Sequence, residues 1–368
     1  MPRSQQSEQP RGVTERQSAA FHNIHLMGNR AAQAANKAAR STVGFVARRI
    51  AASDWLMGFV YDHMNEANFA GLAEHEEMLS DSVRVHTYHR GIQNNVQPGD
   101  VVLDLGTGTG LLAFMASRAG AKKVYAIEHS DFIQVARELA KHNGFTNIEF
   151  VQANSREFTP TEPIDVVLHE QMGDELFNEN MLQNLLDLRD RVLRPGGLIL
   201  PAIFRLFAEP VTFEDSMRIR RFWNIDLPDD IDLAAAEHSP VAQRFNTGRN
   251  DQFWARPGSV ASTIGEPHPI LEFDLHSLES LDSLNTDHLI DRTASADAIV
   301  DGCCVWFEAD FDGTTTLSTS PMAQLTSWGN RIFRLDQPVT VGTQLRLNLR
   351  MGQLFEPSTW SVNLLGNS

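Results

Sequence analysis

Glycines recur at every second position within the segment Asp104–Gly110, which follows a short apolar run. Gly106 and Gly108 lack a Cβ atom, so the backbone there can approach a ligand closely, and a helix N-terminus is expected directly after the segment. Glu128 ends the next apolar run, and its carboxylate can accept hydrogen bonds from both hydroxyls of a ribose. With Asp104 just before the glycines, these residues predict a site for a nucleoside-containing cofactor. Nicotinamide-dependent enzymes use a related loop, so the glycines alone leave the cofactor open.

Two carboxylates follow the fourth apolar run of the same region. Glu170 comes directly after the run, and Glu179 lies further along the same loop. Two ionised carboxylates that approach each other repel unless a cation lies between them. A guanidinium suits this position, because it is planar, permanently charged and presents parallel N–H donors. Glu179 also has a simpler interpretation, since an acid in the first turn of a helix interacts favourably with the helix dipole.

Short apolar runs alternate with helical patterns between residues 100 and 200. The expected strands are Val101–Leu105, Val124–Ile127, Ile148–Val151, Val166–Leu168 and Leu198–Leu200. One helix is expected between Ser130 and Gly144, and another after Asn178, ending at the turn Arg194–Gly197. Strands that alternate with helices in this way predict an α/β fold, with a mostly parallel sheet and helices on both faces.

Beyond Pro201 the apolar residues alternate with a period of two, which is typical of strands with one buried face. The clearest runs are Cys303–Phe311, Arg331–Leu335, Gln344–Met351 and Trp360–Leu364. We expect an antiparallel β-barrel or sandwich here, interrupted by an acidic, Pro-containing stretch around Asp226–His238 that is compatible with a helical arm. The chain then divides into a basic extension over 1–50 that is partly disordered or helical, an α/β domain over 51–200 and a β domain over 201–368.

The net charge of −16 over 368 residues argues against a nucleic-acid footprint, which requires a basic surface. Residues 1–50 carry +6, so residues 51–368 carry −22, and an acidic body favours cationic substrates.

No apolar run approaches the ~18 residues of a membrane span. The cysteines Cys303 and Cys304 are too few for a disulfide framework and suit a reducing compartment, so we expect a cytoplasmic protein. The alternative is an organelle transit peptide in the Arg-rich, acid-poor extension. Histidines are scattered, and no metal site is expected.

The order of a strand, an acidic GxGxG turn and a strand ending in Glu128 resembles the class I S-adenosylmethionine-dependent methyltransferases. The LRPGG segment at 193–197 adds to this resemblance. The alternatives are a Rossmann-like fold that binds no cofactor and a nicotinamide enzyme. Methyl transfer to a guanidinium needs a nitrogen lone pair, and carboxylates such as Glu170 and Glu179 can bias charge away from the attacking nitrogen while holding it in place.

Three further segments, in the right order, resemble the protein arginine methyltransferase family over most of residues 60–355. They are HEEMLSDSVRVHTY at 75–88, HEQMGDELFNENML at 169–182 and STSPMAQLTSW at 318–328. They are similar to the family's helix before the first strand, its double-glutamate loop and its Thr-His-Trp loop. The resemblance implies a Rossmann-like domain followed by an antiparallel β-barrel, a helical dimerisation arm near 224–240 and a homodimer.

The resemblance also implies roles on the cofactor side of the site. Arg84 binds the carboxylate of S-adenosylmethionine, and Glu128 binds its ribose. The cofactor turn is lined by Asp104, Gly106 and Gly108, and His75 and Met78 lie beside the cofactor. His75 also has a simpler interpretation as a polar residue satisfied within the fold.

On the acceptor side, the resemblance implies that Glu170 and Glu179 clamp the substrate guanidinium. The pocket around it is completed by Met78, Met181, Ser327 and Trp328. From the residues alone, Met78, Met181 and Trp328 are packing residues more often than substrate contacts.

The sequence departs from the family at three places. Asn65–Phe69 replaces an aromatic-rich segment and loses a hydroxyl at position 69, and Arg156 or Glu157 stands where the family has an adenine-contacting acid. Ser327 replaces the loop histidine, although Asp81, its expected partner, remains. The acceptor therefore stays open among an arginine-containing protein, a peptide and free arginine or a derivative. Alternatives are a class I methyltransferase for another amine, a nucleic-acid methyltransferase and a catalytically idle scaffold.

Overall fold

A computed structural model of the protein describes residues 72–177, 180–217, 223, 225, 227–244, 252–255, 258–294, 298–342 and 344–367. The basic extension 1–50, the segment Asn65–Phe69 and Glu179 lie outside these residues. The predicted division of the chain at residues 50 and 200 stays a prediction.

A five-stranded parallel sheet forms the first part of the fold, in the order β3-β2-β1-β4-β5. Its strands are β1 Val101–Leu105, β2 Lys123–Glu128, β3 Ile148–Gln152, β4 Ile164–His169 and β5 Leu193–Leu200. Every residue of β1 is buried, as expected for a central strand covered on both faces. The parallel α/β sheet predicted from the alternating pattern is confirmed.

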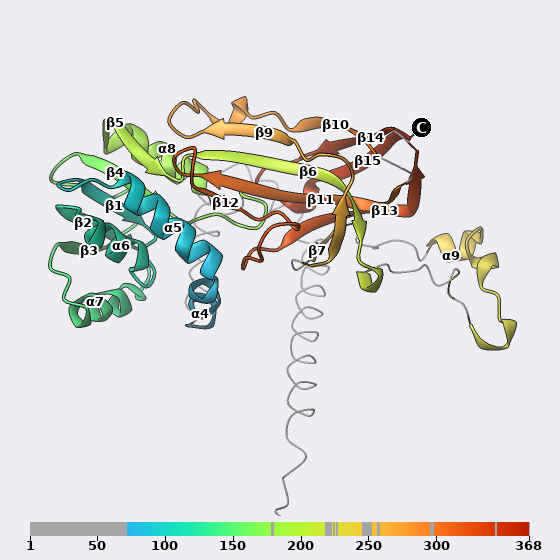
Figure 1. Cartoon of the computed structure of the whole chain (residues 1–368), viewed down its shortest axis with the longest axis horizontal. Coiled ribbons are helices and arrows are strands. Elements are labelled where there is room, and N and C mark those ends of the chain that lie inside the picture. Colours follow the sequence, from blue (N-terminus) through green and yellow to red (C-terminus); the bar gives the residue numbers. More distant parts are fainter. Residues whose placement is uncertain are drawn as a thin grey trace, which may run out of the picture. The chain divides into compact units, whose positions relative to one another are not determined.

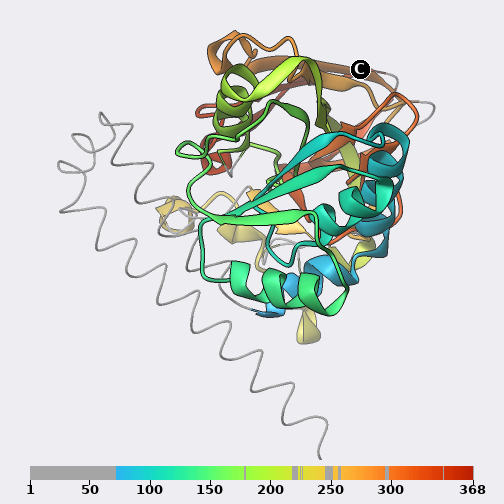
Figure 2. The same cartoon turned by 90° about the vertical axis from the view of Figure 1, so that its left-hand side faces the viewer.

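Five helices accompany this sheet in the described residues. They are α4 Leu72–Ser80, α5 Ser82–Asn95, α6 Leu111–Ala119, α7 Ile133–His142 and α8 Met181–Arg191. The strand order reverses direction between β1 and β4, so right-handed crossovers place α6 and α8 on opposite faces of the sheet (Figure 2). The ligand edge of such a sheet lies at this reversal, beyond the carboxyl ends of β1 and β4.

The segment Arg194–Gly197 lies inside β5 rather than between a helix and a strand. Ile164 on β4 pairs with Leu193, but Val166 pairs with Leu198, so β5 bulges outward between these pairs. Gly196 has a φ of 74°, which lets the bulge turn back into the sheet. The predicted turn is therefore a bulge, because β4 continues to pair with β5 on both sides of it.

The second part of the fold is antiparallel, as predicted (Figure 1). One sheet has the order β7-β13-β11-β6-β8, with β12 paired to β11 and β9 paired to β6, and a three-stranded sheet has the order β10-β14-β15. The strands are β6 Ile203–Phe213, β7 Gln252–Ala255, β8 Val260–Thr263, β9 Pro269–Asp274, β10 Asp287–Thr293, β11 Ala298–Asp310, β12 Thr316–Ser318, β13 Asn330–Val341, β14 Gln344–Arg350 and β15 Ser361–Asn367.

The predicted arm contains short helical turns in its described part. They are Pro228–Asp230, Ala234–Ala236 and α9 Pro240–Arg244. Several large apolar side chains of this region are exposed, namely Ile225, Leu227, Ile231 and Val241. No helix within the described residues is long and apolar enough to cross a membrane.

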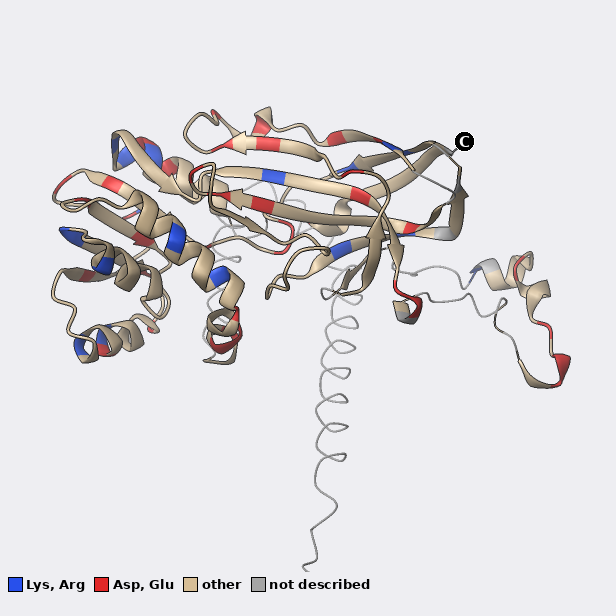
Figure 3. Ribbon diagram, in the orientation of Figure 1, with Lys and Arg blue, Asp and Glu red and all other residues tan. Residues whose placement is uncertain are grey.

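Opposite charges face each other across the strands of the larger antiparallel sheet (Figure 3). Arg205 on β6 pairs with Glu272 on β9 at 2.6 Å and with Asp310 on β11 at 3.4 Å. Cross-strand pairs of this kind contribute about 0.2–1 kcal/mol each. They support the strand register, while burial of apolar side chains supplies most of the stability.

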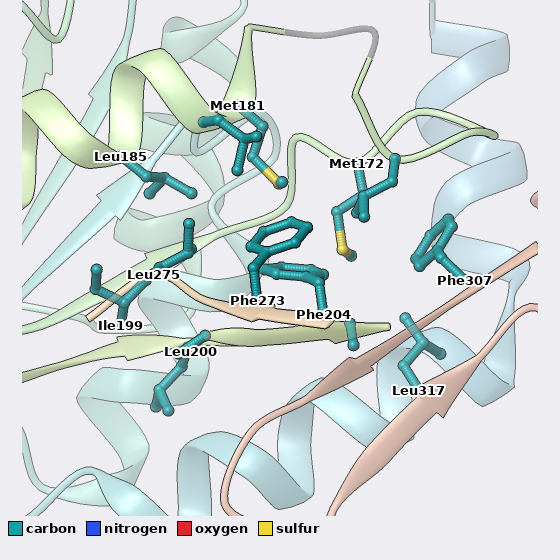
Figure 4. Packing of buried hydrophobic residues seen from close by; sticks show 14 of the residues in the cluster. Met172, Met181, Leu185, Ile199, Leu200, Phe204, Phe273, Leu275, Phe307 and Leu317 are labelled. Carbon is teal, nitrogen blue, oxygen red and sulfur yellow. The ribbon is translucent and has the colours of Figure 1, made fainter. Parts of the chain in front are cut away.

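One hydrophobic core runs from the parallel sheet into the antiparallel sheets. Phe204 and Phe273 stack at 5.4 Å between ring centroids, and Met172 and Met181 pack beside them from the loop after β4 and from α8 (Figure 4). Burying one such side chain contributes about 1.5–3 kcal/mol. The loop between β4 and α8 is therefore anchored by apolar packing at its two ends.

Gly302 is expected to tolerate no side chain. It lies on β11 next to a register shift, and a Cβ atom there would overlap the carbonyl oxygen of Phe333 and lie 2.9 Å from the ring of Phe213. Gly302→Ala should therefore lower the free energy of unfolding by about 2 kcal/mol, measured by urea denaturation. Gly366→Ala is the matched control, because, apart from its chain neighbours, no atom of the described residues lies within 4 Å of the added Cβ. Equal stability of the two variants would contradict the prediction.

Candidate active site

The glycine turn after β1 is built around the buried carboxylate of Asp104. Its Oδ2 accepts hydrogen bonds from the Thr107 hydroxyl at 2.6 Å and from the Ala113 backbone N–H, in α6, at 3.0 Å. Gly106 and Gly108 have φ values of 70° and 50°, a region that glycine enters without strain. Asp104 thus ties the start of α6 to the end of β1.

Burial raises the pKa of Asp104 to about 6, against the hydrogen bonds from Thr107 and Ala113 that lower it. The second oxygen, Oδ1, is buried and has no hydrogen-bond partner among the residues that the structure describes. A buried acceptor normally has a partner. This atom and the glycine turn therefore fit a polar ligand, as the sequence predicts for the cofactor.

Glu128 ends β2 with its carboxylate turned toward the same turn. Its Oε2 accepts from the Gly108 N–H at 3.3 Å, and its Oε1 accepts from the Ser130 N–H at 3.0 Å. The His129 Nδ1 also lies 3.3 Å from Oε1, whereas Oε2 retains a lone pair for a further donor. The position fits a ribose whose hydroxyls donate to a carboxylate.

The side of the turn facing α4 is covered by His75. Its ring stacks on Phe132 with centroids 3.9 Å apart, and a Cβ atom at Gly108 would lie 3.1 Å from its Cε1. His75 is thus next to the glycine turn, where the sequence placed it. Met78 is half-buried on the same helix.

Arg84 and Glu170, which the sequence assigned to cofactor and acceptor, form an ion pair with each other. Arg84 comes from the first turn of α5, where its backbone N–H bonds to the N-cap Asp81, and Glu170 directly follows β4. The Arg84 guanidinium also lies over the ring of Trp328, 5.2 Å from the centroid. A guanidinium is therefore already held between a carboxylate and an aromatic face in this site.

Burial, with a smaller contribution from the charge of Asp81, raises the pKa of Glu170 to about 7, although the charge and hydrogen bond of Arg84 act in the opposite direction. Such a shift shows that the carboxylate is removed from water and depends on a cation for its charge. Perturbed carboxylates of this kind gather at functional sites.

The loop that contains Ser327 and Trp328 closes over this pair. The Trp328 indole donates to the Met172 carbonyl at 2.7 Å, and Trp328 is only 6% exposed. Ser327 donates to Asp81 through its backbone N–H at 2.7 Å and its hydroxyl at 3.1 Å. Ser327 therefore keeps the contact with Asp81 that was expected of a histidine at this position, without an imidazole to transfer a proton.

The acceptor-side roles of two residues stay predictions. Met181 is fully buried in the hydrophobic core, which agrees with the packing role that the sequence also allowed (Figure 4). Glu179 lies outside the described residues, so its role as the second clamp stays a prediction. Arg156 and Glu157 are exposed, and both backbone N–H groups bond to Asn154.

Several contacts at the site were not predicted. The Tyr88 hydroxyl of α5 donates to the His169 carbonyl at 3.0 Å, next to Glu170. Asp174 and Glu175 in the same loop bind Trp254 and Arg331 of the antiparallel sheet. The two adjacent acids are visible in the sequence, but nothing local indicates partners so distant along the chain.

Comparisons with known proteins agree with this architecture. A methyltransferase domain model matches residues 102–197, and the model of the arginine methyltransferase oligomerization subdomain matches residues 206–358. Protein arginine N-methyltransferase 6 of Danio rerio is 32% identical over 289 residues, covering 76% of this chain and 81% of the relative.

Two solved structures share the fold. A chain of the Trypanosoma brucei PRMT1 enzyme-prozyme heterotetrameric complex with AdoHcy is 25% identical and covers 77% of this chain and 88% of its own, with a TM-score of 0.63. Protein arginine methyltransferase 10 of Arabidopsis thaliana covers 82% of this chain and 97% of its own at 24% identity, with a TM-score of 0.66. The chain belongs to the protein arginine N-methyltransferase family, whose members are S-adenosylmethionine-dependent enzymes.

Proposed function

We propose that this arginine N-methyltransferase acts on an arginine side chain within a protein or peptide, and that Glu170 holds the substrate guanidinium. The observation that carries the proposal is the buried carboxylate at the end of β4, paired with a guanidinium under Trp328. Glu179 is proposed as the second carboxylate of the clamp. The acidic body of the chain favours approach of an arginine-rich segment.

On the cofactor side, we propose that Asp104 and the glycine turn hold the nucleoside portion and that Glu128 accepts from the ribose. Arg84 binds the carboxylate of the cofactor's methionine part, which requires it to release Glu170. S-adenosylmethionine, when bound, supplies an electrophilic methyl group on a sulfonium. His75 lies against the turn and forms one wall of the cofactor site.

The residues of the chain act by position and charge. Ionised Glu170 bonds to selected guanidinium nitrogens, so the positive charge is drawn toward them and away from the attacking nitrogen. Trp328 and Met172, bonded to each other, wall the acceptor side. Holding the attacking nitrogen in line with the methyl group lowers the entropic part of the activation free energy, because the two reactants are already positioned.

Methylation should depend on the ionisation of Glu170. Its pKa of about 7 means that kcat/KM, which reports the free enzyme, falls as pH drops below about 7.

The contribution of Glu170 to the free energy of unfolding changes with pH in the opposite direction. Because the folded pKa exceeds the ordinary value of 4.5, Glu170 lowers the free energy of unfolding as pH rises from 4.5 to about 7.

Asp81→Asn tests this assignment of the pH profile, because it removes a charge that raises the pKa of Glu170. The midpoint of the kcat/KM profile should then move to lower pH. An unchanged midpoint in this variant would assign the titration to another group.

The acceptor is tested by offering labelled S-adenosylmethionine with arginine-rich peptides and free arginine side by side, followed by mass analysis of the products. We expect methylated arginine in the peptides. Methyl transfer to free arginine but to none of the peptides would contradict the proposal of a protein or peptide acceptor. The absence of any transfer, together with no heat of S-adenosylmethionine binding in calorimetry, would favour the idle scaffold.

We also propose a homodimer, supported by the match to an oligomerization subdomain and by the exposed apolar residues of the arm region. Light scattering should give twice the chain mass of 41.1 kDa. A single species at 41.1 kDa across micromolar concentrations would contradict it. A cytoplasmic location stays a prediction, to be tested by cell fractionation.

A further inference from the structure

The loop between β4 and α8 contains a tight turn at its centre. The Leu176 N–H donates to the Gly173 carbonyl at 2.9 Å, and Leu176 adopts a left-handed conformation with a φ of 77°. A leucine in this region is strained, so its surroundings must hold it there. Asp174 and Glu175 are the two residues at the tip of the turn.

Both acids at the tip bind the antiparallel sheet. Asp174 accepts from the Trp254 indole N–H at 2.6 Å and from the Gly329 backbone N–H at 2.9 Å. Glu175, which is 2% exposed, pairs with the Arg331 guanidinium at 2.5 Å. Trp254 on β7 and Arg331 on β13 are directly opposite each other in the strand register. Two adjacent acids therefore hold two adjacent cross-strand partners.

The position of the Trp254 indole depends on Gly329. A Cβ atom at Gly329 would overlap the indole ring, so only glycine lets the ring lie against the backbone there. In this position the indole N–H points at Asp174. Gly329 also directly follows Trp328, whose own indole donates to Met172 in the same loop. Both indoles thus bond to the loop from the antiparallel sheet side.

We infer that Asp174 and Glu175 are positioning residues, which hold the acceptor loop against β7 and β13 and thereby fix Glu170 at one end of it. The inference rests on the proposed function, because it assigns these residues to the placement of the guanidinium clamp. Burial raises the pKa of both carboxyls, while their indole, backbone and guanidinium partners favour the ionised form. Neither acid contacts the cofactor turn, so its loss should affect the acceptor rather than the cofactor.

The bond between Trp254 and Asp174 is tested by Trp254→Phe, Asp174→Asn and the double variant. Phenylalanine keeps an aromatic ring against Gly329 but lacks the N–H donor. We expect each single variant to lower kcat with an arginine-rich peptide at least tenfold, with an unchanged Kd for S-adenosylmethionine. The double variant should be no slower than the slower single variant, because both changes remove one interaction. Wild-type kcat in the single variants would overturn the inference.

The Glu175–Arg331 pair has a matched control in Glu209 and Arg292. Glu209 is fully buried and pairs with Arg292 at 2.5 Å between β6 and β10, away from the loop. Glu175→Gln should lower kcat at temperatures where it is fully folded, whereas Glu209→Gln should lower only the Tm. If the two variants lose kcat equally at equal folded fraction, Glu175 has only a structural role and the inference is wrong.

Hydrogen–deuterium exchange separates this inference from the proposed function. In Trp254→Phe and Asp174→Asn, amides of residues 171–177 should exchange at least tenfold faster, while those of β1 stay protected. If the wild-type protein methylates no arginine acceptor, the proposed function is wrong. Amide exchange in residues 171–177 then still tests whether Asp174 and Glu175 position the loop. Unchanged exchange in both variants would overturn the positioning role.

Discussion

Glu170→Gln is expected to lower kcat for arginine methylation by about 10²–10³-fold, a loss typical for removal of a preorganised electrostatic partner. The variant retains a hydrogen-bonding side chain of similar shape but loses the charge that attracts a guanidinium. In the free protein Glu170 is paired with Arg84. Its replacement leaves Arg84 available for a ligand carboxylate, so S-adenosylmethionine should bind at least as tightly as to wild type. The measurements are steady-state kinetics with an arginine-rich peptide and calorimetry with the cofactor.

Arg84→Gln is the complementary variant. It removes the group proposed to bind the cofactor carboxylate, so cofactor affinity should fall, in contrast to Glu170→Gln. It also removes the cation that lowers the pKa of Glu170, so the midpoint of the pH profile should rise. Methyl transfer by Glu170→Gln at the wild-type rate would show that the clamp assignment is wrong.

Asp104→Ala is expected to remove cofactor binding and to lower the free energy of unfolding by about 2–4 kcal/mol. Asp104 is fully buried, and its loss leaves the Thr107 hydroxyl and the Ala113 N–H without their acceptor. Each buried donor left unsatisfied costs about 1–3 kcal/mol. Chemical denaturation gives the stability, and calorimetry with S-adenosylmethionine gives the binding.

Thr107→Val is the control for Asp104→Ala. It removes one donor to Asp104 but keeps the carboxylate and its bond to the start of α6. Its loss of stability should be smaller, and cofactor binding should remain measurable. If Asp104→Ala binds the cofactor as well as wild type does, Asp104 is a structural residue of the turn and no part of the cofactor site.

Much of the parallel sheet could be predicted from local patterns. The run Val101–Leu105 coincides with β1, because a central strand buried on both faces is a largely apolar run, interrupted here only by the buried Asp104. The bounds of β5 are harder to predict, because the Pro-Gly-Gly sequence of residues 195–197 favours a turn when only neighbouring residues are considered. Only the pairing of β4 on both sides of this segment reveals that it is a bulge.

The candidate site could be predicted only where its residues belong to local patterns. Asp104 lies near the end of β1, just before the glycine turn, and Glu128 ends β2. Because the carboxyl ends of parallel strands meet at one edge of the sheet, the local pattern already places these two residues near each other. The pairing of Arg84 with Glu170 joins residues 86 positions apart, and that of Glu175 with Arg331 joins residues 156 positions apart. Such partners are chosen by the packing of β4, α5 and β13, which no local pattern encodes.

The ion pair between Arg84 and Glu170 has a consequence for how the two substrates influence each other. On the proposed roles, a ligand carboxylate replaces Glu170 at Arg84 and a substrate guanidinium replaces Arg84 at Glu170, so both ligands open the same internal contact. Whichever ligand binds first bears that opening free energy, and the second binds to a protein already opened. Thermodynamic linkage makes the effect reciprocal, so each ligand raises the affinity of the site for the other by the same factor. Because the free energy of opening the ion pair is borne only once, the second ligand binds more tightly than it would to the empty protein.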